Sequence, residues 1–411
     1  MNPPRRHVLA ANQITPSLAP FVDTISDLKA GRHYKPLTSA MTTLKGSRIL
    51  VERHRDRGIG DMLFMTGPLS YISHMAGGAV HIDMYGLVDR SAILHNHPAL
   101  TYGGVMSGPI LYDDLPLYNY HWFSDSVTEY DETSDQLNVY DALYAQLGID
   151  PKTVPPKFKR PSLQLSRNDF SDLDSLYHMV ASQRNIDLRS QPYYVLSPVS
   201  YSSLRVAPYS MWLSLAQELS KKRPVIFAGH MAADGQMPAA GMSFGQFYQA
   251  AGQLGPRVLN LIGNTSIRVI AALISRALAV VSLDSGLLYV AQALNTPAVS
   301  LWGTHSPVTR IGYDNAYMRY AIHKRSVCPA SPCYAYAGFP YSRCARGVSQ
   351  VTCEPLAAVT AQEIIAKIGD IERDQLAVVR REQMASPTQD AQSPAAASLS
   401  SSATTDAGSA S

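Results

Sequence analysis

The sequence predicts an α/β protein with two Rossmann-like domains, and three observations lead to that prediction. Short apolar runs alternate along the chain with longer stretches of helical periodicity, which is the pattern of βαβ units in parallel sheets. The alternation comes in two runs, which the proline-rich stretch at residues 151–161 separates. The 411 residues suffice for two domains at roughly 100–200 residues each.

The first run predicts strands at residues 48–51 and 79–84, with a helix from Asp61 to about residue 76 between them. A further helix is expected at residues 136–147, because Gly148 is a natural residue to end it. The second run is longer and repeats the pattern. Its strands are expected at 193–197, 224–228, 278–282 and 297–301, and its helices at 209–221, 266–276 and 285–294.

The composition excludes several classes of protein. Apolar residues make up 46% of the chain and charged residues 16%, so the chain can bury sizeable cores. The formal charge of +3 excludes a chain-wide polybasic nucleic-acid binder, and four cysteines exclude a disulfide-dense secreted scaffold. The apolar stretch near the start is shorter than the roughly 7–15 residues of a signal peptide. We therefore expect a cytoplasmic protein without a nucleic-acid partner.

A glycine turn follows the first predicted strand. The segment Arg57–Asp61 carries Gly58 and Gly60, the first two glycines of a dinucleotide fingerprint, but Leu63 replaces the third. That departure and the lack of a Walker A pattern disfavour NAD enzymes and P-loop NTPases. The turn places the carboxylate of Asp61 at a helix start, at the sheet edge where open α/β sheets bind ligands. The alternative is that Asp61 only caps the helix.

A second pair of polar turns lies in the second run. Asp284, Ser285 and Gly286 join a buried strand to a helix, and the N–H groups at such a helix start attract anions. The glycine also allows a ligand to approach the backbone closely. Thr304 and His305 lie in the polar turn after the next strand, and together the two turns are compatible with a diphosphate site. The alternative for Asp284 is an ordinary N-cap.

These segments together resemble the heptosyltransferase family of glycosyltransferases, over about residues 47–369. The matching pieces are Arg57–Asp61, Arg205–Pro208 with Trp212, Gly263–Ile267, Val281–Ala291, Ala293–Pro307 and Cys328–Cys353. The resemblance implies a GT-B fold, in which two Rossmann-like domains face a central cleft. The implied parts are an N-terminal extension (1–46), an acceptor-side domain (47–185), a nucleotide-sugar-binding domain (186–359), a closing helix (360–385) and a disordered tail (386–411).

The resemblance also implies a function: inverting transfer of a heptose or similar sugar from a nucleotide diphosphate sugar, such as ADP-heptose, to an acceptor hydroxyl. The acceptor would be a glycan or glycolipid of lipopolysaccharide or other surface glycan synthesis. Through that acceptor, a cytoplasmic enzyme would associate peripherally with the inner face of the membrane. A non-catalytic glycan- or nucleotide-binding module on the same fold is the alternative, because fold does not fix function.

The family's functional residues fall on matching positions of this chain. Its general base falls on Asp61, and its basic residue on the donor phosphates falls on Arg205, where members usually have Lys. Its donor loop falls on Asp284, Ser285 and Gly286, and Tyr289 stands where members usually have His. A base, a cation and a helix start would together serve the reaction without a catalytic metal.

The cysteines cluster in one segment. Cys328, Cys333, Cys344 and Cys353 could bind a structural zinc, form disulfides in an oxidising environment, or remain buried thiols. No CxxC pair occurs among them, so the sequence leaves these three alternatives open.

Overall fold

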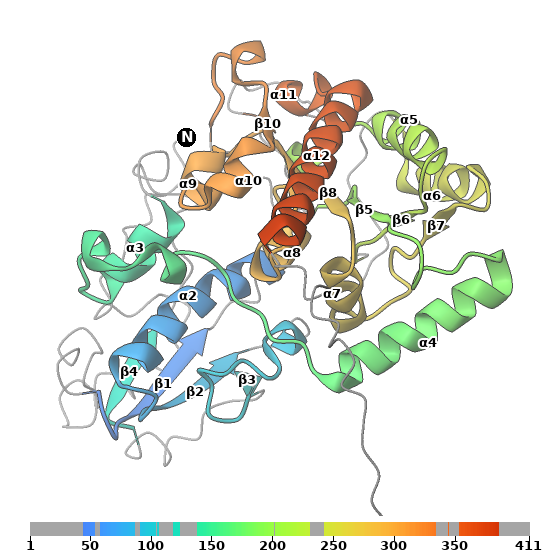
Figure 1. Cartoon of the computed structure of the whole chain (residues 1–411). Coiled ribbons are helices and arrows are strands. Elements are labelled where there is room, and N and C mark those ends of the chain that lie inside the picture. Colours follow the sequence, from blue (N-terminus) through green and yellow to red (C-terminus); the bar gives the residue numbers. More distant parts are fainter. Residues whose placement is uncertain are drawn as a thin grey trace, which may run out of the picture. The chain divides into compact units, whose positions relative to one another are not determined.

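The computed structural model describes residues 44–53, 58–86, 91–103, 105–106, 118–123, 138–200, 202–230, 242–333, 344 and 353–385. The expected extension up to residue 43, Arg57 of the first turn, and the expected tail from residue 386 lie outside the described residues. Two parallel β-sheets organise the described part, and helices connect their strands (Figure 1). The predicted α/β class with parallel sheets is therefore confirmed.

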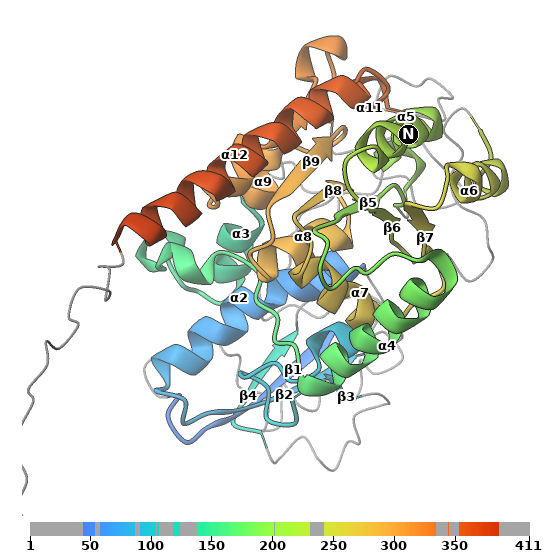
Figure 2. The same cartoon turned by 45° about the vertical axis from the view of Figure 1, so that its right-hand side comes forward.

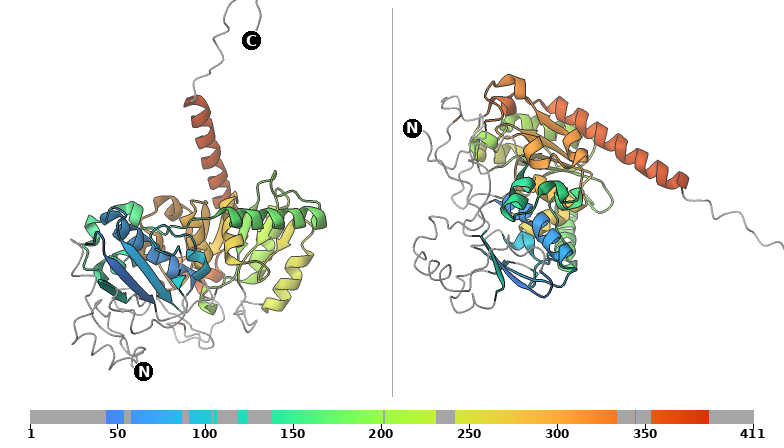
Figure 3. Two further views of the ribbon diagram at one scale, coloured as in Figure 1. Left: turned by 90° about the horizontal axis from the view of Figure 1, so that it is seen from below. Right: turned by 90° about the vertical axis from the view of Figure 1, so that its left-hand side faces the viewer.

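The smaller sheet has the strand order β3-β2-β1-β4 and lies in the first half of the chain (Figure 3). Its strands are β1 (Arg48–Arg53), β2 (His81–Gly86), β3 (Val105–Met106) and β4 (Tyr120–Phe123), all paired in parallel. The helix α2 (Ile59–Met75) connects β1 to β2. Ile49, Leu50 and Val51 are fully buried, which is typical of a strand covered on both faces.

The larger sheet has the order β10-β9-β8-β5-β6-β7. Its strands are β5 (Tyr194–Ser197), β6 (Val225–Phe227), β7 (Val258–Asn260), β8 (Ala279–Leu283), β9 (Ala298–Trp302) and β10 (Ala321–His323). The chain runs outward from β5 to β7 and then returns to place β8 beside β5. The strand order therefore reverses between β5 and β8, and open α/β sheets bind ligands outside the carboxyl ends of strands at such a point.

The helices of the second half agree with the predicted alternation. Those expected from the sequence are α5 (Tyr209–Ser220), α7 (Ile267–Ser275) and α8 (Gly286–Ala293). The structure adds four that we did not predict: α6 (Phe244–Gln253), α9 (Pro307–Ile311), α10 (Asn315–Arg319) and α11 (Glu354–Ala357). Three of these four have only four or five residues, too few for helical periodicity to show.

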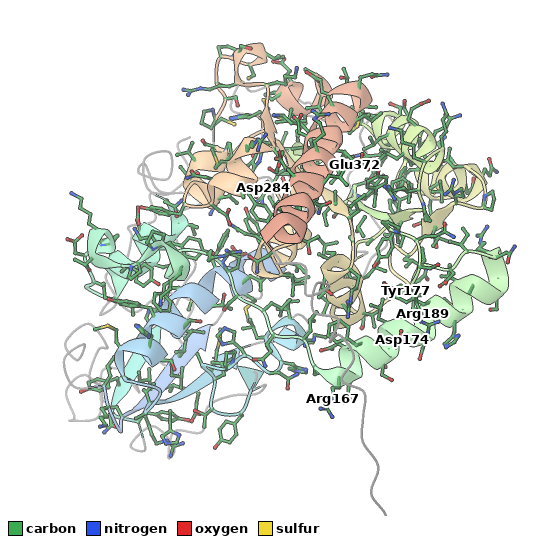
Figure 4. The ribbon with its side chains drawn as sticks, viewed as in Figure 1. Arg167, Asp174, Tyr177, Arg189, Asp284 and Glu372 are labelled. Carbon is green, nitrogen blue, oxygen red and sulfur yellow. The ribbon has the colours of Figure 1, made fainter. Side chains whose placement is uncertain are left out.

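The proline-rich stretch connects α3 (Val139–Gln146) to a long helix that was not predicted from the sequence. This helix, α4 (Arg167–Arg184), begins at a capping box in which Ser166 and Asp169 bond each other's backbone N–H groups. Arg189, which follows α4, pairs with Asp174 in the middle of this helix at 3.2 Å and lies over the ring of Tyr177 (Figure 4).

A buried ion pair joins α4 to α7. The guanidinium of Arg268 donates to both carboxylate oxygens of Asp169, at 3.0 and 2.5 Å. It also donates to the carbonyl oxygens of Gln164 and, in the first half of the chain, of Ile93 and His95. One side chain of the second half thus contacts three segments that precede it. The predicted boundary between the domains at residues 185–186 stays a prediction, as does a central cleft.

The last helix, α12 (Ala361–Ala385), lies where the sequence predicts a helix at residues 360–385, and its closing role stays a prediction. Residue contacts divide the chain within this helix, into the units Met1–Gly369 and Asp370–Ser411, and the first unit contains both sheets. In the first unit, Ile364 and Ile368 of α12 are buried. Among the described residues, no helix has the length and apolar character needed to cross a bilayer.

Candidate active site

The loops after β5 and β8 bring two predicted site residues together. Arg205 ends a short 3₁₀ turn after β5, and Asp284 directly follows β8 (Figure 4). Because these strands are neighbours at the point where the strand order reverses, their loops lie side by side. The Nη1 atom of Arg205 is 3.7 Å from Oδ2 of Asp284, and only 15% of the Arg205 side chain is exposed. The guanidinium is thus not the surface ion-pair partner that the residue type alone would suggest.

The carboxylate of Asp284 is buried, and its two oxygens differ: Oδ1 accepts a hydrogen bond, whereas Oδ2 accepts none from the described residues. The phenol of Tyr289 donates to Oδ1 at 2.5 Å, and Oδ2 lies 3.4 Å from Nδ1 of His305. The alternative of an Asp284 N-cap is wrong, because the N-cap of α8 is Ser285. The hydroxyl of Ser285 lies 3.2 Å from that of Ser282, and the Ser285 side chain does not cap the helix.

Thr304 and His305 follow β9 and are both buried. The hydroxyl of Thr304 lies 3.0 Å from Nδ1 of His305, so Thr304 contacts the site through its neighbour. Burial, and then the nearby charges of Arg205 and Arg310, lower the pKa of His305 well below its usual value. This imidazole is therefore neutral near pH 7, whereas Arg205 carries a full positive charge 3.7 Å from Oδ2 of Asp284.

The first turn of α2 holds the predicted base. Gly58 is the N-cap of α2, and Asp61 is the third helical residue, half-buried. The alternative of Asp61 as the N-cap is therefore wrong, although a carboxylate in the first turn still interacts favourably with the helix dipole. A Cβ added to Gly58 would lie 3.7 Å from Oδ2 of Asp61, which is ordinary van der Waals contact.

The helices α2 and α8 meet at their first turns (Figures 1 and 2). A Cβ on Gly286 would lie 2.8 Å from Cβ of Ile59 and 3.3 Å from N of Gly60. A Cβ on Gly60 would in turn lie 2.8 Å from Cδ2 of Tyr289. The sequence led us to expect that Gly286 would let a ligand approach the backbone. In the structure, the missing side chain at this position instead allows the close approach of α2. The contact brings the turn that contains Asp61 against the loop that contains Asp284.

Three side chains in this arrangement were not predicted as site residues from the sequence. The sequence marked Tyr289 only as a departure from the family, and its hydrogen bond to Asp284 depends on the helical turn between them. Phe64 packs edge-on against Tyr289 with ring centroids 4.5 Å apart, and Arg310 lies 5.8 Å over the ring of Phe64. Arg310 belongs to a short helix that has no clear signal in the sequence.

The cysteines lie together, beside the loop with Thr304. Cys328, Cys333, Cys344 and Cys353 line one small cavity, to which Gly303 and Thr304 also contribute. Burial raises the pKa of the Cys353 thiol to about 12, so this thiol is protonated near neutral pH. Within the described ranges, no group of three or more His, Cys, Asp or Glu side chains has an arrangement that could hold a metal ion.

Comparison with known protein families identifies the family of the chain. The sequence profile described as glycosyltransferase family 9 (heptosyltransferase) matches residues 122–335, just over half of the chain. The chain belongs to this family. The matched range of this heptosyltransferase family member includes Arg205, Asp284 and the Thr304–His305 turn, whereas Asp61 precedes it. A comparison with curated protein sequences finds no match.

Solved structures confirm the fold of this family 9 member. ADP-heptose lipopolysaccharide heptosyltransferase II of E. coli is 16% identical, with a TM-score of 0.55 over 80% of this chain and 99% of that one. The family 9 glycosyl transferase of Veillonella parvula is 13% identical, with a TM-score of 0.52 over 80% and 98%. The iron-containing dodecameric glycosyltransferase TibC of enterotoxigenic E. coli is 15% identical, with a TM-score of 0.55 over 81% of each chain. The predicted GT-B fold is therefore correct.

Proposed function

We propose that this chain transfers a heptose or similar sugar from a nucleotide diphosphate sugar to an acceptor hydroxyl, with inversion at the sugar carbon. The observation that carries the proposal is the contact between the first turn of α2 and the Asp284 loop, where a Cβ on Gly286 would be 3.3 Å from N of Gly60. The turn that contains Asp61, the proposed base, thus packs against the loop that we propose holds the diphosphate.

Arg205 and the start of α8 would bind the donor. The first turn of a helix offers N–H groups and a positive dipole to the phosphates, and no side chain caps α8. Arg205 adds a full positive charge, held by Asp284 at 3.7 Å. A guanidinium can take two phosphate oxygens at once, whereas the Lys usual in the family acts as a point charge.

Asp61 would act as the general base. Inversion in one step requires a base on the acceptor side, which removes the proton as the hydroxyl oxygen attacks the sugar carbon. The electron pair of the breaking C–O bond goes to the nucleoside diphosphate, whose growing negative charge Arg205 and α8 stabilise. The half-buried position of Asp61 in the first turn of α2 leaves it accessible to an acceptor.

A divalent cation is not part of this proposed mechanism, because Arg205 and the helix start can stabilise the leaving group by themselves. The expected test result is full transfer in EDTA, with no gain from magnesium or manganese. A zinc at the cysteines, one of the three alternatives that the sequence leaves open, would be structural, and it has no support from the described side chains. Measuring the metal content of the purified protein separates such a structural metal from a catalytic one.

ADP-heptose is the donor we propose to test first. TibC has been crystallised with ADP-D-β-D-heptose, and its fold matches this chain with a TM-score of 0.52 at 14% identity. The acceptor we propose is a glycan or glycolipid of lipopolysaccharide or another surface glycan. Such an acceptor would bring a cytoplasmic enzyme to the inner face of the membrane.

The deciding experiment measures release of nucleoside diphosphate from a panel of nucleotide sugars, with and without glycan acceptors, and the anomeric configuration of the product. Acceptor-dependent release with an inverted product supports the proposal, and Asp61→Asn serves as the matched inactive variant. A protein that binds nucleotide sugars without releasing diphosphate would be the non-catalytic module instead.

A further inference from the structure

Tyr289 contacts both halves of the proposed site. Its hydroxyl donates to Oδ1 of Asp284 at 2.5 Å, in the loop assigned to the donor. Its ring lies against the backbone of α2, where a Cβ on Gly60 would be 2.8 Å from Cδ2 and 3.0 Å from Cε2. The ring of Phe64, one turn further along α2, packs against it edge-on. This single buried side chain therefore extends from the turn that contains Asp61 to the carboxylate of Asp284.

We propose that Tyr289 is a positioning residue that fixes Asp284, and through it Arg205, against the first turn of α2. The proposal rests on the proposed function, in which Arg205 binds the donor diphosphate and Asp61 is the base. Tyr289 does not touch the substrates in this scheme. It sets the direction of the Asp284 carboxylate and the separation of the two turns.

The hydroxyl matters because Asp284 is buried. A buried carboxylate depends on its hydrogen-bond donors, and loss of one donor leaves the charge poorly solvated. Without the phenol, the carboxylate would rotate toward its remaining neighbours, and Arg205 would move with it. Burial, and then the charge of Asp284, raise the pKa of Tyr289 well above its usual value, so the phenol keeps its proton at physiological pH.

The chain supplies a matched control in Tyr144 of α3. This tyrosine is also fully buried, and its hydroxyl donates at 2.9 Å to the carbonyl oxygen of Phe158. Tyr144→Phe and Tyr289→Phe each remove one buried hydroxyl and keep the ring. Only Tyr289→Phe removes a hydrogen bond to a carboxylate, so the pair separates positioning from general loss of stability.

The first measurement is amide hydrogen exchange over residues 284–290, which does not require activity. We expect Tyr289→Phe to speed exchange there about tenfold and Tyr144→Phe to leave it unchanged. Tyr289→His should restore part of the protection, because an imidazole N–H can also donate to Asp284. Wild-type exchange in Tyr289→Phe, or equal acceleration in both Phe variants, would overturn the proposal. An inactive wild-type protein would contradict the proposed function alone, since this comparison still decides the role of Tyr289.

The second measurement is a double-mutant cycle on binding of ADP by calorimetry. If Tyr289 acts through Asp284 on Arg205, the effects of Tyr289→Phe and Arg205→Lys should not add. In transfer assays, Tyr289→Phe should lower kcat/KM for the donor about tenfold, with most of the change in KM. Strictly additive effects in the cycle would show that Tyr289 does not act on Arg205.

Discussion

Gly60 of α2 faces the ring of Tyr289 of α8, so closely that a Cβ atom at position 60 would lie 2.8 Å from Cδ2. Gly60 has no unusual backbone conformation, since it lies within a regular helix. The glycine is needed because another side chain already occupies the space. The two helices approach each other at the ends from which the proposed base and the proposed donor loop extend.

The first prediction follows from this contact. Gly60→Ala should lower the free energy of unfolding by about 1–3 kcal/mol, the usual cost of overpacking, because the Tyr289 ring is buried and has little room to move. Gly252→Ala in α6 is the control, since a Cβ there meets nothing within 4 Å. Alanine is otherwise favoured over glycine in helices by about 1 kcal/mol, so the control should be neutral or stabilised. Equal stabilities in urea unfolding would contradict the contact.

The second prediction concerns the base. Asp61→Asn should leave the fold and ADP binding intact while turnover falls by about 10²–10⁴, the usual contribution of a general base. The measurement is steady-state transfer with saturating donor, beside calorimetric ADP binding. Near-normal turnover in this variant would remove Asp61 from the mechanism.

The third prediction concerns the donor phosphates. Arg205→Ala should weaken ADP binding about tenfold or more, because the diphosphate loses a charge-assisted partner. Arg205→Lys should recover part of the affinity, since it keeps the charge but not the planar fork. If the Lys variant binds ADP as poorly as the Ala variant, Arg205 has a structural role in holding Asp284 rather than a role in phosphate binding.

The fourth prediction concerns the buried ion pair of Arg268 and Asp169. Arg268→Met should cost about 3–5 kcal/mol of unfolding free energy, because it leaves a buried carboxylate without its cation. Arg189→Met, which breaks the exposed pair with Asp174, should cost no more than about 1 kcal/mol. Chemical denaturation of both variants measures the difference. Comparable losses would mean that the Arg268 pair is no stronger than a surface pair.

The ion pair of Asp169 also makes the stability of the protein depend on pH. Burial raises the pKa of Asp169, but hydrogen bonds from Arg268 and Ser166 outweigh burial, and the net pKa is lowered. A lowered folded-state pKa stabilises the protein above the unfolded value of about 3.9, and the stabilisation is lost as the pH falls through the folded value. As the pH is lowered below about 4, the unfolding midpoint should therefore decrease in the wild type. In Asp169→Asn it should decrease less steeply. Parallel pH curves would rule out this contribution.

The fifth prediction compares two truncations. A chain that ends at residue 385 should keep its melting temperature and its ADP binding, because residues 386–411 contain almost no large apolar side chain. A chain that ends at residue 360 loses the buried side chains of Ile364 and Ile368 and should unfold at a clearly lower temperature. Thermal unfolding distinguishes them, and a large loss from the first truncation alone would contradict the compositional interpretation.

Several elements in the first half of the chain have no clear local pattern. Strand β3 has only two residues, too few for an apolar pattern, and His121 interrupts the apolar residues of β4, so neither strand was predicted. Helix α4 is polar over most of its length, although the Ser166–Asp169 capping box would have indicated its start. By contrast, β5, β8 and β9 are apolar except for one serine each, and their positions were predicted to within about one residue.

The sequence alone determined the strands β5, β6, β8 and β9 and the helices α5, α7 and α8, the two turns with Asp61 and Asp284, and the resemblance that gave the family. These features depend on local patterns of residues, which are visible in the sequence itself. Only the tertiary structure decided that β8 returns to lie beside β5, which brings Arg205 to 3.7 Å from Asp284. It also decided that Gly60 and Gly286 serve the approach of two helices, and that Tyr289 is the donor to Asp284. Such relationships depend on the packing of residues far apart in the chain, and no local pattern encodes them.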